Sequence, residues 1–228
     1  MKTYIAALFG LMLLFAGYPG AQEKKEEAYT PKTMEEKKSY HMGYNIGSTF
    51  RAQMLEPDLA VLVKGIMAAM KGEKSTIADA ELKAVEQAIF DEMAARHKKA
   101  GEEYLAKTAK DPEVTTLKSG LQYKVIKKGK GKSPKADDNV AIHYRGSLIS
   151  GVVFEETDPS TPANYFVSEL LKGFSEALQL MKEGDKWQLF VPTDLAYGLR
   201  SPPNIPPNAA LIFELELVKV NGPAKKDM

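Results

Sequence analysis

The sequence contains no cysteine and only three histidines, which excludes several kinds of chemistry at once. Without cysteine, the chain can form no disulfide, thiolate metal site, cysteine nucleophile or lipid anchor attached through sulfur. The histidines, His41, His97 and His143, lie far apart in the sequence, and no two have the spacing of paired metal ligands. We therefore expect the protein to use neither a metal ion nor another cofactor.

The sequence also lacks an excess of charge of one sign and any long hydrophobic run. It has 31 Lys and Arg against 30 Asp and Glu, which argues against a protein that mainly binds nucleic-acid phosphates. An apolar run at residues 4–16 follows Lys2 and precedes small residues up to Ala21. This pattern is typical of a secretory signal peptide, so we predict that residues 1–21 direct export. The alternative is an uncleaved membrane anchor, although the run is short for spanning a bilayer.

The chain does contain enough apolar residues for a buried core, with 44% hydrophobic and 27% charged residues. Thr33 and Glu36 have the spacing of a capping box, which predicts the start of a first helix. Pro57 is expected at the first position of a second helix, which Gly72 would end. Residues 22–30, rich in Glu and Lys, are predicted to form a solvated leader before these helices.

A long third helix is predicted over residues 76–111. Proline is absent from residues 76 to 110, and apolar residues recur with a period near 3.5. Such a helix would be roughly 52 Å long at 1.5 Å per residue. Its second half is mostly Lys, Glu and Ala, so we expect it to bury little and to act as a rigid strut between two bodies. The alternative is a helix folded back on its own domain.

The pattern changes from a helical period to two-residue alternation at Asp111 and Pro112. Alternating apolar residues predict half-buried antiparallel strands at residues 121–125, 140–144, 189–191 and 211–217. Residues 170–181 between these strands are predicted to form one helix. Helices followed by strands around a single helix indicate an α+β fold in two domains.

The catalytic constellations that can be recognised in a sequence are missing. There is no Gly-rich phosphate loop and no nucleophile elbow. His143 falls on a strand, where a surface histidine is the more frequent case, and the pairs Glu155–Glu156 and Glu102–Glu103 are more often solvated than catalytic. Any chemistry is therefore expected to need neither a nucleophile nor a metal.

Five short motifs of aromatic and apolar residues nevertheless follow one another through the second half of the chain. They are His143-Tyr144-Arg145-Gly146, Gly151-Val152-Val153-Phe154, Leu170-Leu171-Lys172-Gly173-Phe174, Ala196-Tyr197-Gly198, and Asn204-Ile205-Pro206-Pro207-Asn208 with Ala210-Leu211-Ile212-Phe213-Glu214-Leu215. This order resembles the FK506-binding-protein (FKBP) type of peptidyl-prolyl cis/trans isomerase over roughly residues 113–221.

The upstream sequence resembles the macrophage infectivity potentiator (Mip) branch of exported bacterial FKBPs. The motif Gly43-Tyr44-Asn45-Ile46-Gly47 lies in the first helix, where each glycine costs about 1 kcal/mol relative to alanine, so another helix is expected to approach there. The resemblance implies a homodimer that associates through residues 22–111. It divides the chain into a helical dimerisation module (22–75), a long linking helix (76–111), an isomerase domain (112–222) and a tail (223–228). Residues 112–228 alone are expected to be monomeric and active on short peptides.

The reaction that the resemblance implies needs only an apolar pocket around the prolyl amide, with no covalent step. A prolyl bond isomerises over a barrier of about 18–20 kcal/mol because twisting breaks amide resonance. The twisted amide has lost charge separation, so an apolar pocket favours it over the planar form. The resemblance assigns to the site an aromatic lining of Tyr144, Phe154, Phe174 and Phe213. It also implies a wall of Leu170 and Leu171, in which the Leu171 N–H donates to a substrate carbonyl. By the same resemblance, Tyr197 is a hydroxyl donor, Ile205 lies at the far side, and Tyr165 forms a further wall.

Two positions depart from the family's usual pattern. Glu155 stands where the family has Asp, and its longer side chain is expected to form a weaker hydrogen bond with Tyr144. Phe174 stands where the family has Trp, and the only tryptophan, Trp187, falls in a later strand. Both changes keep the chemical character, so we expect isomerase activity to survive with altered affinity for macrolide inhibitors.

The resemblance thus predicts an exported, homodimeric prolyl isomerase with chaperone activity. It would act on unfolded or proline-containing polypeptides in the periplasm or at the outer-membrane surface of a Gram-negative-type bacterium. One alternative is a non-catalytic holdase or interaction module that keeps the FKBP fold. Another is a surface adhesin or virulence factor, a role that is defined by binding partners rather than by a reaction.

Overall fold

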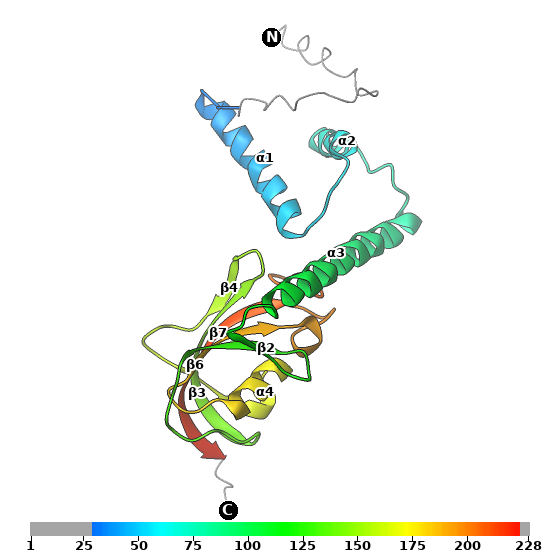
Figure 1. Cartoon of the computed structure of the whole chain (residues 1–228). Helices are drawn as coiled ribbons and strands as arrows, with labels where there is room; N and C mark the ends of the chain where they lie inside the picture. The colour runs from blue at the N-terminus through cyan, green and yellow to red at the C-terminus, as the bar shows by residue number, and fades with distance from the viewer. Residues whose placement is uncertain (1–28, 224–228) are drawn as a thin grey trace, which may run out of the picture. The chain divides into compact units, whose positions relative to one another are not determined.

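The computed structural model describes residues 29–223 (Figure 1). The chain divides into two units at residues 43 and 44, and the described parts of each, residues 29–43 and 44–223, are treated separately. The signal peptide predicted at residues 1–21 and nearly all of the predicted tail lie outside the described residues. Over residues 29–223, no helix combines the length and the apolarity needed to cross a membrane.

Helix α1, Met34–Ala52, begins with the predicted capping box. The Glu36 N–H donates to Thr33 Oγ1 at 3.1 Å, and the Thr33 N–H donates to Glu36 Oε2 at 3.1 Å. Hydrogen bonds from the Lys32 N–H and then the Thr33 N–H to the carboxylate lower the pKa of the Glu36 carboxyl. The capping box is therefore confirmed.

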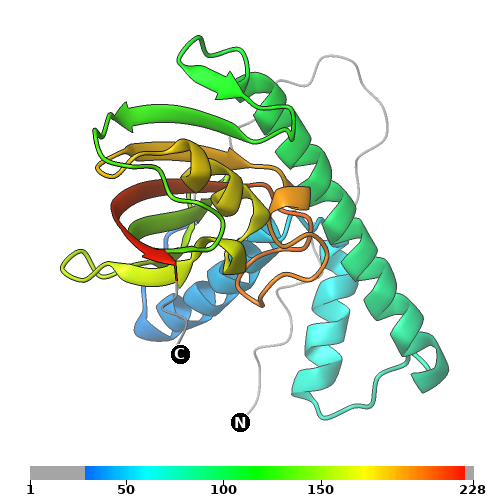
Figure 2. The same cartoon turned by 90° about the horizontal axis from the view of Figure 1, so that it is seen from below.

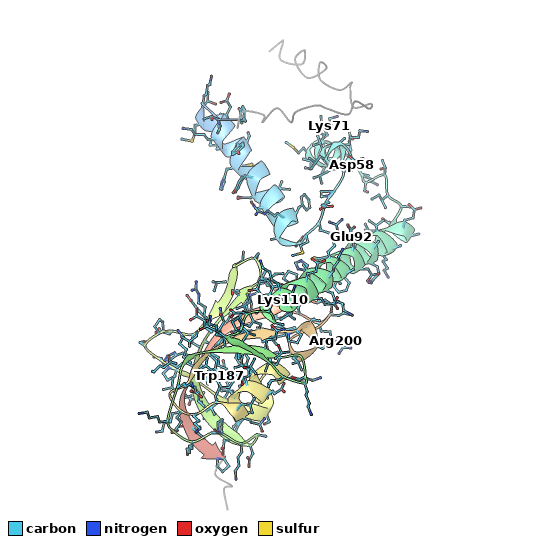
Figure 3. The ribbon with its side chains drawn as sticks, viewed as in Figure 1. Asp58, Lys71, Glu92, Lys110, Trp187 and Arg200 are labelled. Atoms are coloured by element: carbon cyan, nitrogen blue, oxygen red, sulfur yellow. The ribbon has the colours of Figure 1, made fainter. Side chains whose placement is uncertain are left out.

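Helix α2, Leu59–Met70, begins two residues later than predicted. Its N-cap is Asp58, whose carboxylate accepts hydrogen bonds from two N–H groups of the first turn. Pro57 offers no such acceptor, so its placement at the first helical position was wrong. Gly72, with φ of 72°, follows the C-cap Lys71 and ends the helix as predicted. Asp58 and Lys71 mark the two ends of α2 in Figure 3.

Helix α3, Asp79–Thr108, confirms the predicted long helix. Its second half does not extend freely, because Ala94, His97 and Gly101 are buried. Figures 1 and 2 show this half lying beside the sheet, while the N-terminal half extends away from it. The expectation that the second half buries little was wrong, because its buried positions are two small residues and a histidine, which the apolar pattern of the sequence does not mark.

Seven antiparallel strands form one sheet in the order β1-β2-β6-β7-β3-β4, and β5 pairs with β3. The four stretches with clear alternation are confirmed as the long strands, whereas the short β1, β4 and β5 had no periodic signal. The strands are β1 (Val114–Thr116), β2 (Gln122–Lys127), β3 (Asp138–Leu148), β4 (Val153–Glu156), β5 (Ala163–Phe166), β6 (Lys186–Val191) and β7 (Leu211–Pro223).

The two helices of this part of the chain cover opposite faces of the sheet. Helix α4, Lys172–Leu180, shares the hydrophobic core with Leu189 and Val191 of β6. Since side chains alternate along a strand, Phe190 lies on the other face, where its ring meets that of Tyr104 in α3 at 6.3 Å between centroids. The architecture is α+β, as predicted.

Candidate active site

The predicted aromatic pocket is a cavity of about 280 Å³ on the α4 face of the sheet. Its walls come from strands β3, β4, β5 and β7, from the segment that leads into α4, and from the turn after β6. The lining residues are Tyr144, Glu155, Tyr165, Glu169, Leu170, Leu171, Phe174, Tyr197 and Phe213. Seven of the nine residues proposed from the sequence are among them, and Phe154 and Ile205 are not.

The floor of the pocket is a cluster of aromatic rings in edge-to-face contact. Phe174, 3% exposed, meets Phe213 at 4.6 Å and Tyr144 at 5.8 Å between ring centroids. Phe154 stands behind the lining, with its ring 5.7 Å from that of Phe213. Edge-to-face contacts of this kind add about 0.5–1.5 kcal/mol each beyond burial. The floor is therefore apolar and held in place by its own packing.

Gly146 provides the space that these rings occupy. It lies opposite Phe213 in the pairing of β3 with β7. A Cβ atom there would come within 2.6 Å of the Phe154 ring and 2.7 Å of the Phe213 ring, closer than side chains approach. The glycine of the sequence motif at residues 143–146 is thus required by the site itself.

One hydroxyl at the pocket is fixed by a carboxylate. The Tyr144 hydroxyl donates to Glu155 Oε1 at 2.8 Å, which is an ordinary length for this bond. The hydrogen bond expected between Tyr144 and Glu155 is therefore present. Burial, and then interactions with Glu155 and Tyr165, raise the pKa of the Tyr144 hydroxyl. Tyr144 consequently remains a neutral donor at physiological pH.

A second hydroxyl, that of Tyr197, has no hydrogen-bond partner within residues 29–223. Burial raises its pKa, and so does the negative charge of Glu155. The side chain is half-buried in the pocket wall. It is therefore a neutral donor available to a ligand.

The segment before α4 places two leucines at the pocket wall. Leu171 is the N-cap residue of α4, with a non-helical backbone, so α4 begins two residues later than predicted. The N–H of this residue is not part of the hydrogen-bond ladder of the helix. The Ser175 hydroxyl ties the helix to the preceding turn by donating to the Val167 carbonyl oxygen at 2.6 Å. Glu169, also at the wall, was missed in the sequence, although it directly precedes Leu170.

Ile205 lies outside the pocket. It is 4% exposed within the hydrophobic core and lines a separate cavity of about 380 Å³, together with Phe90 and Met93 of α3. Its neighbour Asn204 is connected to the site, because its Nδ2 donates to the Phe154 carbonyl oxygen at 3.2 Å. Ile205 therefore belongs to the support of the pocket rather than to its lining.

Two residues singled out in the sequence lie away from the pocket. Trp187, labelled in Figure 3, is buried and stacks on Tyr123 with ring centroids 4.2 Å apart. His143 lines a polar groove beside Lys186 and Glu214. Among the described residues, no three His, Cys, Asp or Glu side chains are grouped as a metal site.

The pocket offers apolar contact and neutral hydroxyl donors, without a nucleophile–base pair.

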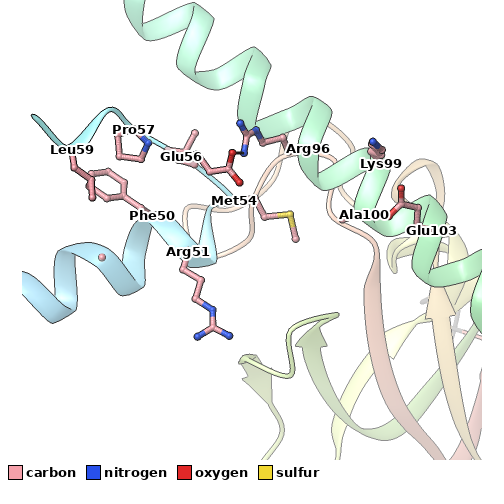
Figure 4. Close-up of a pocket in the computed structure, with 12 residues that line it drawn as sticks. Phe50, Arg51, Met54, Glu56, Pro57, Leu59, Arg96, Lys99, Ala100 and Glu103 are labelled. Carbon is pink, nitrogen blue, oxygen red and sulfur yellow. Dashed lines mark ion pairs between the residues drawn. The ribbon is translucent and has the colours of Figure 1, made fainter. Parts of the chain in front are cut away.

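A larger cavity of about 730 Å³ lies between the end of α1, the α1–α2 connection and α3 (Figure 4). Phe50, Met54 and Leu59 give it an apolar lining. An ion pair between Arg96 and Glu56, 3.0 Å long, crosses its rim. This arrangement suits the binding of apolar side chains but contains no catalytic geometry.

Comparison with known families matches most of the chain to two models. The model described as "FKBP-type peptidyl-prolyl cis-trans isomerase" matches residues 130–218. The model described as "Domain amino terminal to FKBP-type peptidyl-prolyl isomerase" matches residues 35–125.

Individual proteins are similar over nearly the whole length. The outer membrane protein MIP of Legionella longbeachae is 35% identical over 98% of this chain and 99% of its own length. The FKBP-type peptidyl-prolyl cis-trans isomerase FkpA of Aeromonas hydrophila is 36% identical over 90% of this chain and 82% of its own length. Among solved structures, FkpA from Escherichia coli superposes with a TM-score of 0.58 at 32% identity, covering 86% of this chain and all of that one.

Proposed function

Because the chain belongs to the family of FKBP-type peptidyl-prolyl cis-trans isomerases, we propose that its isomerase reaction takes place in the aromatic pocket between β3, α4 and β7. The observation that carries this assignment is the convergence of four separated motifs on one cavity. Tyr144, Leu170, Leu171, Phe174, Tyr197 and Phe213 come from these motifs and all line it.

The apolar floor supplies the main catalytic effect. A planar prolyl amide carries separated charge that water stabilises, whereas the twisted amide of the transition state has lost it. Phe174 and Phe213, 3% and 2% exposed, form a dry surface under the substrate proline. Transfer into this surface costs the planar form more than the twisted form, so the barrier falls. No covalent step is involved.

Hydrogen bonds orient the substrate on this floor. The Tyr197 hydroxyl donates to a substrate carbonyl, and the Leu171 N–H can donate to a second one. The bond between Tyr144 and Glu155 holds the Tyr144 ring at the side of the pocket. Raised pKa values keep the hydroxyls of Tyr144 and Tyr197 protonated. These residues therefore position the prolyl bond without exchanging protons with it.

The ligands that suit this pocket are prolyl segments of unfolded polypeptides. At about 280 Å³, the cavity is large enough for a proline ring with its neighbouring backbone. Macrolide inhibitors are proposed to occupy the same space, with affinity altered by Phe174. The apolar cavity beside α1 and α3 supports an additional chaperone role, in which exposed apolar side chains of a client bind outside the catalytic pocket.

The protein is further proposed to be a homodimer that associates through residues 22–111, with residues 112–222 as the isomerase domain. Support comes from α2, where Val61, Val63 and Met67 are more than half exposed. A Cβ atom at Gly43 or Gly47 would have no atom within 4 Å. The helix expected to approach these glycines is not found within 4 Å of either among the described residues, and a second copy would supply it.

Export to the periplasm or the outer-membrane surface is likewise proposed. Residues 1–21 have the pattern of a signal peptide. The similar Legionella longbeachae protein is described as an outer membrane protein, and this supports the same destination.

A protease-coupled assay with a prolyl tetrapeptide tests the proposed site. The mature protein should accelerate isomerisation, and a macrolide inhibitor should suppress it. The double variant Tyr197→Phe with Phe154→Ala should lose most of the activity, because it removes one donor and one ring of the packed cluster. Trp187→Phe, which changes a core aromatic outside the pocket, is the matched control. A folded protein with no activity above buffer would contradict the assignment and favour the non-catalytic holdase.

A further inference from the structure

Gly101 allows α3 to lie directly on the polypeptide that leads into β7. A Cβ atom at this position would lie 2.8 Å from Ala210 Cβ and 3.3 Å from Ala210 N. The first distance is shorter than real Cβ atoms show, so any side chain would force one of the two segments to move. Gly65 in α2 lacks such a neighbour, since a Cβ there would meet nothing within 4 Å.

Two contacts on the C-terminal side of Gly101 hold the end of α3 on the sheet. Gln122 Nε2 donates to the Leu105 carbonyl oxygen at 3.0 Å, and the Tyr104 ring packs on Phe190. Gln122 and Phe190 are paired neighbours in β2 and β6. Since the helix is anchored to the sheet here, a side chain at Gly101 would displace the segment around Ala210 more readily than the helix.

The displaced segment is connected to the pocket at two points. Ala210 directly precedes β7 and lies three residues before Phe213, which lines the pocket. Upstream, residues 201–207 share a cavity wall with Phe90 and Met93 of α3, and Asn204 donates to the Phe154 carbonyl oxygen. Residues 201–210, called here the support loop, therefore connect α3 with two rings of the aromatic cluster.

We propose that Gly101 is a positioning residue for the isomerase site: its missing side chain lets α3 hold the support loop, and through it Phe154 and Phe213, in the catalytic arrangement. This inference rests on the proposed location of the reaction. It makes the linking helix part of the catalytic unit, although no residue of α3 lines the pocket.

The test compares full-length Gly101→Ala with Gly65→Ala at a temperature where both are folded. Alanine is the better helix former, so the helices themselves should not weaken. Gly101→Ala should reduce kcat/KM for a prolyl tetrapeptide about tenfold, in line with the sensitivity of catalysis to displacements below 1 Å. NMR signals of the Phe154 and Phe213 rings should shift. Gly65→Ala should change neither kcat/KM nor these signals.

A second experiment restores the space between α3 and the support loop by removing the side chain of Ala210 instead. Ala210→Gly combined with Gly101→Ala removes the closest clash and should recover most of the kcat/KM and the ring signals. If Gly101→Ala fails to fold, this double variant must fold and be active. Unchanged activity in Gly101→Ala, or no rescue by Ala210→Gly, would overturn the proposal. An inactive but folded wild-type protein would instead contradict the proposed function, so the two failures are distinguishable.

Discussion

At the scale of single residues, the proposed active site is built on the close packing of three phenylalanine rings and one tyrosine ring. Phe174 touches both Tyr144 and Phe213, and Phe213 touches Phe154. The cluster is closed on the β3 side by the backbone of Gly146 rather than by a side chain. Small changes at that backbone therefore act directly on the rings.

Gly146→Ala is expected to damage activity more than stability. The added methyl group would come within 2.7 Å of two rings, and overpacking of this kind costs about 1–3 kcal/mol of unfolding free energy. Because those rings form the floor and its backing, kcat/KM should fall at least about tenfold. Urea unfolding and the tetrapeptide assay measure the two effects. Gly65→Ala serves as the control, and a Gly146→Ala variant with wild-type kcat/KM would show that ring placement is not limiting.

The sequence allowed most of the pocket lining to be predicted, because short motifs carry it. It could not place Ile205, since burial in the core or exposure to a pocket depends on how the support loop folds against α3. Glu169 has no distinguishing pattern, being one glutamate among many. The strength of the bond between Tyr144 and Glu155 also depends on backbone spacing between β3 and β4, which residue type alone does not give.

At the scale of elements, the packing of α3 on the sheet is the feature that the sequence predicted least well. Sequence patterns identify a packed helix face by its large apolar residues, but this face uses Ala94, His97 and Gly101. Small residues let the helix approach closely, and their contribution is visible only once the partner surface is known. Alternation, by contrast, predicted the four long strands, because one face of each is buried against α4.

Removing α3 is expected to destabilise the isomerase domain, which revises the expectation that residues 112–228 suffice. The truncation would expose Phe190 and leave the Gln122 side chain without its acceptor on Leu105. Exposing one large buried side chain costs about 1.5–3 kcal/mol. Residues 88–228 should therefore unfold at higher urea concentration than residues 112–228 and have higher kcat/KM. Equal midpoints for the two fragments would show that α3 contributes nothing to the domain.

His97 makes the packing of α3 sensitive to acid. The ring is 5% exposed, its Nε2 has no partner among the described residues, and the Gln53 backbone accepts its hydrogen bond. Burial lowers the pKa of His97 in the folded state. The unfolded chain then binds the proton more readily, so stability should fall as the pH drops below about 6.5. Urea unfolding at several pH values should show a smaller acid loss in His97→Gln than in wild type, with His143→Gln as the control for an accessible histidine.

At the scale of the whole molecule, the chain combines the proposed catalytic pocket with a helical segment whose apolar residues are largely exposed. Helix α2 has one charged residue, Lys64, in twelve, and its apolar side chains are largely exposed. Water-exposed apolar surface on this scale is typical of an interface. A second copy of the chain is the proposed occupant, because Gly43 and Gly47 of α1 also leave open space where another helix can approach closely.

Val63→Glu is expected to convert the dimer into a monomer without harming the pocket. Val63 is 51% exposed on α2, so glutamate costs little in an isolated chain but would be buried in a dimer. Glutamate is also the better helix former, which protects α2 itself. Lys64→Glu, at the neighbouring charged position, should remain dimeric. Sedimentation velocity gives the assembly state, and the tetrapeptide assay should give the same kcat/KM per chain for both variants and for wild type. A monomeric wild-type protein would contradict the dimer, whereas a dimeric Val63→Glu variant would move the interface away from this face of α2.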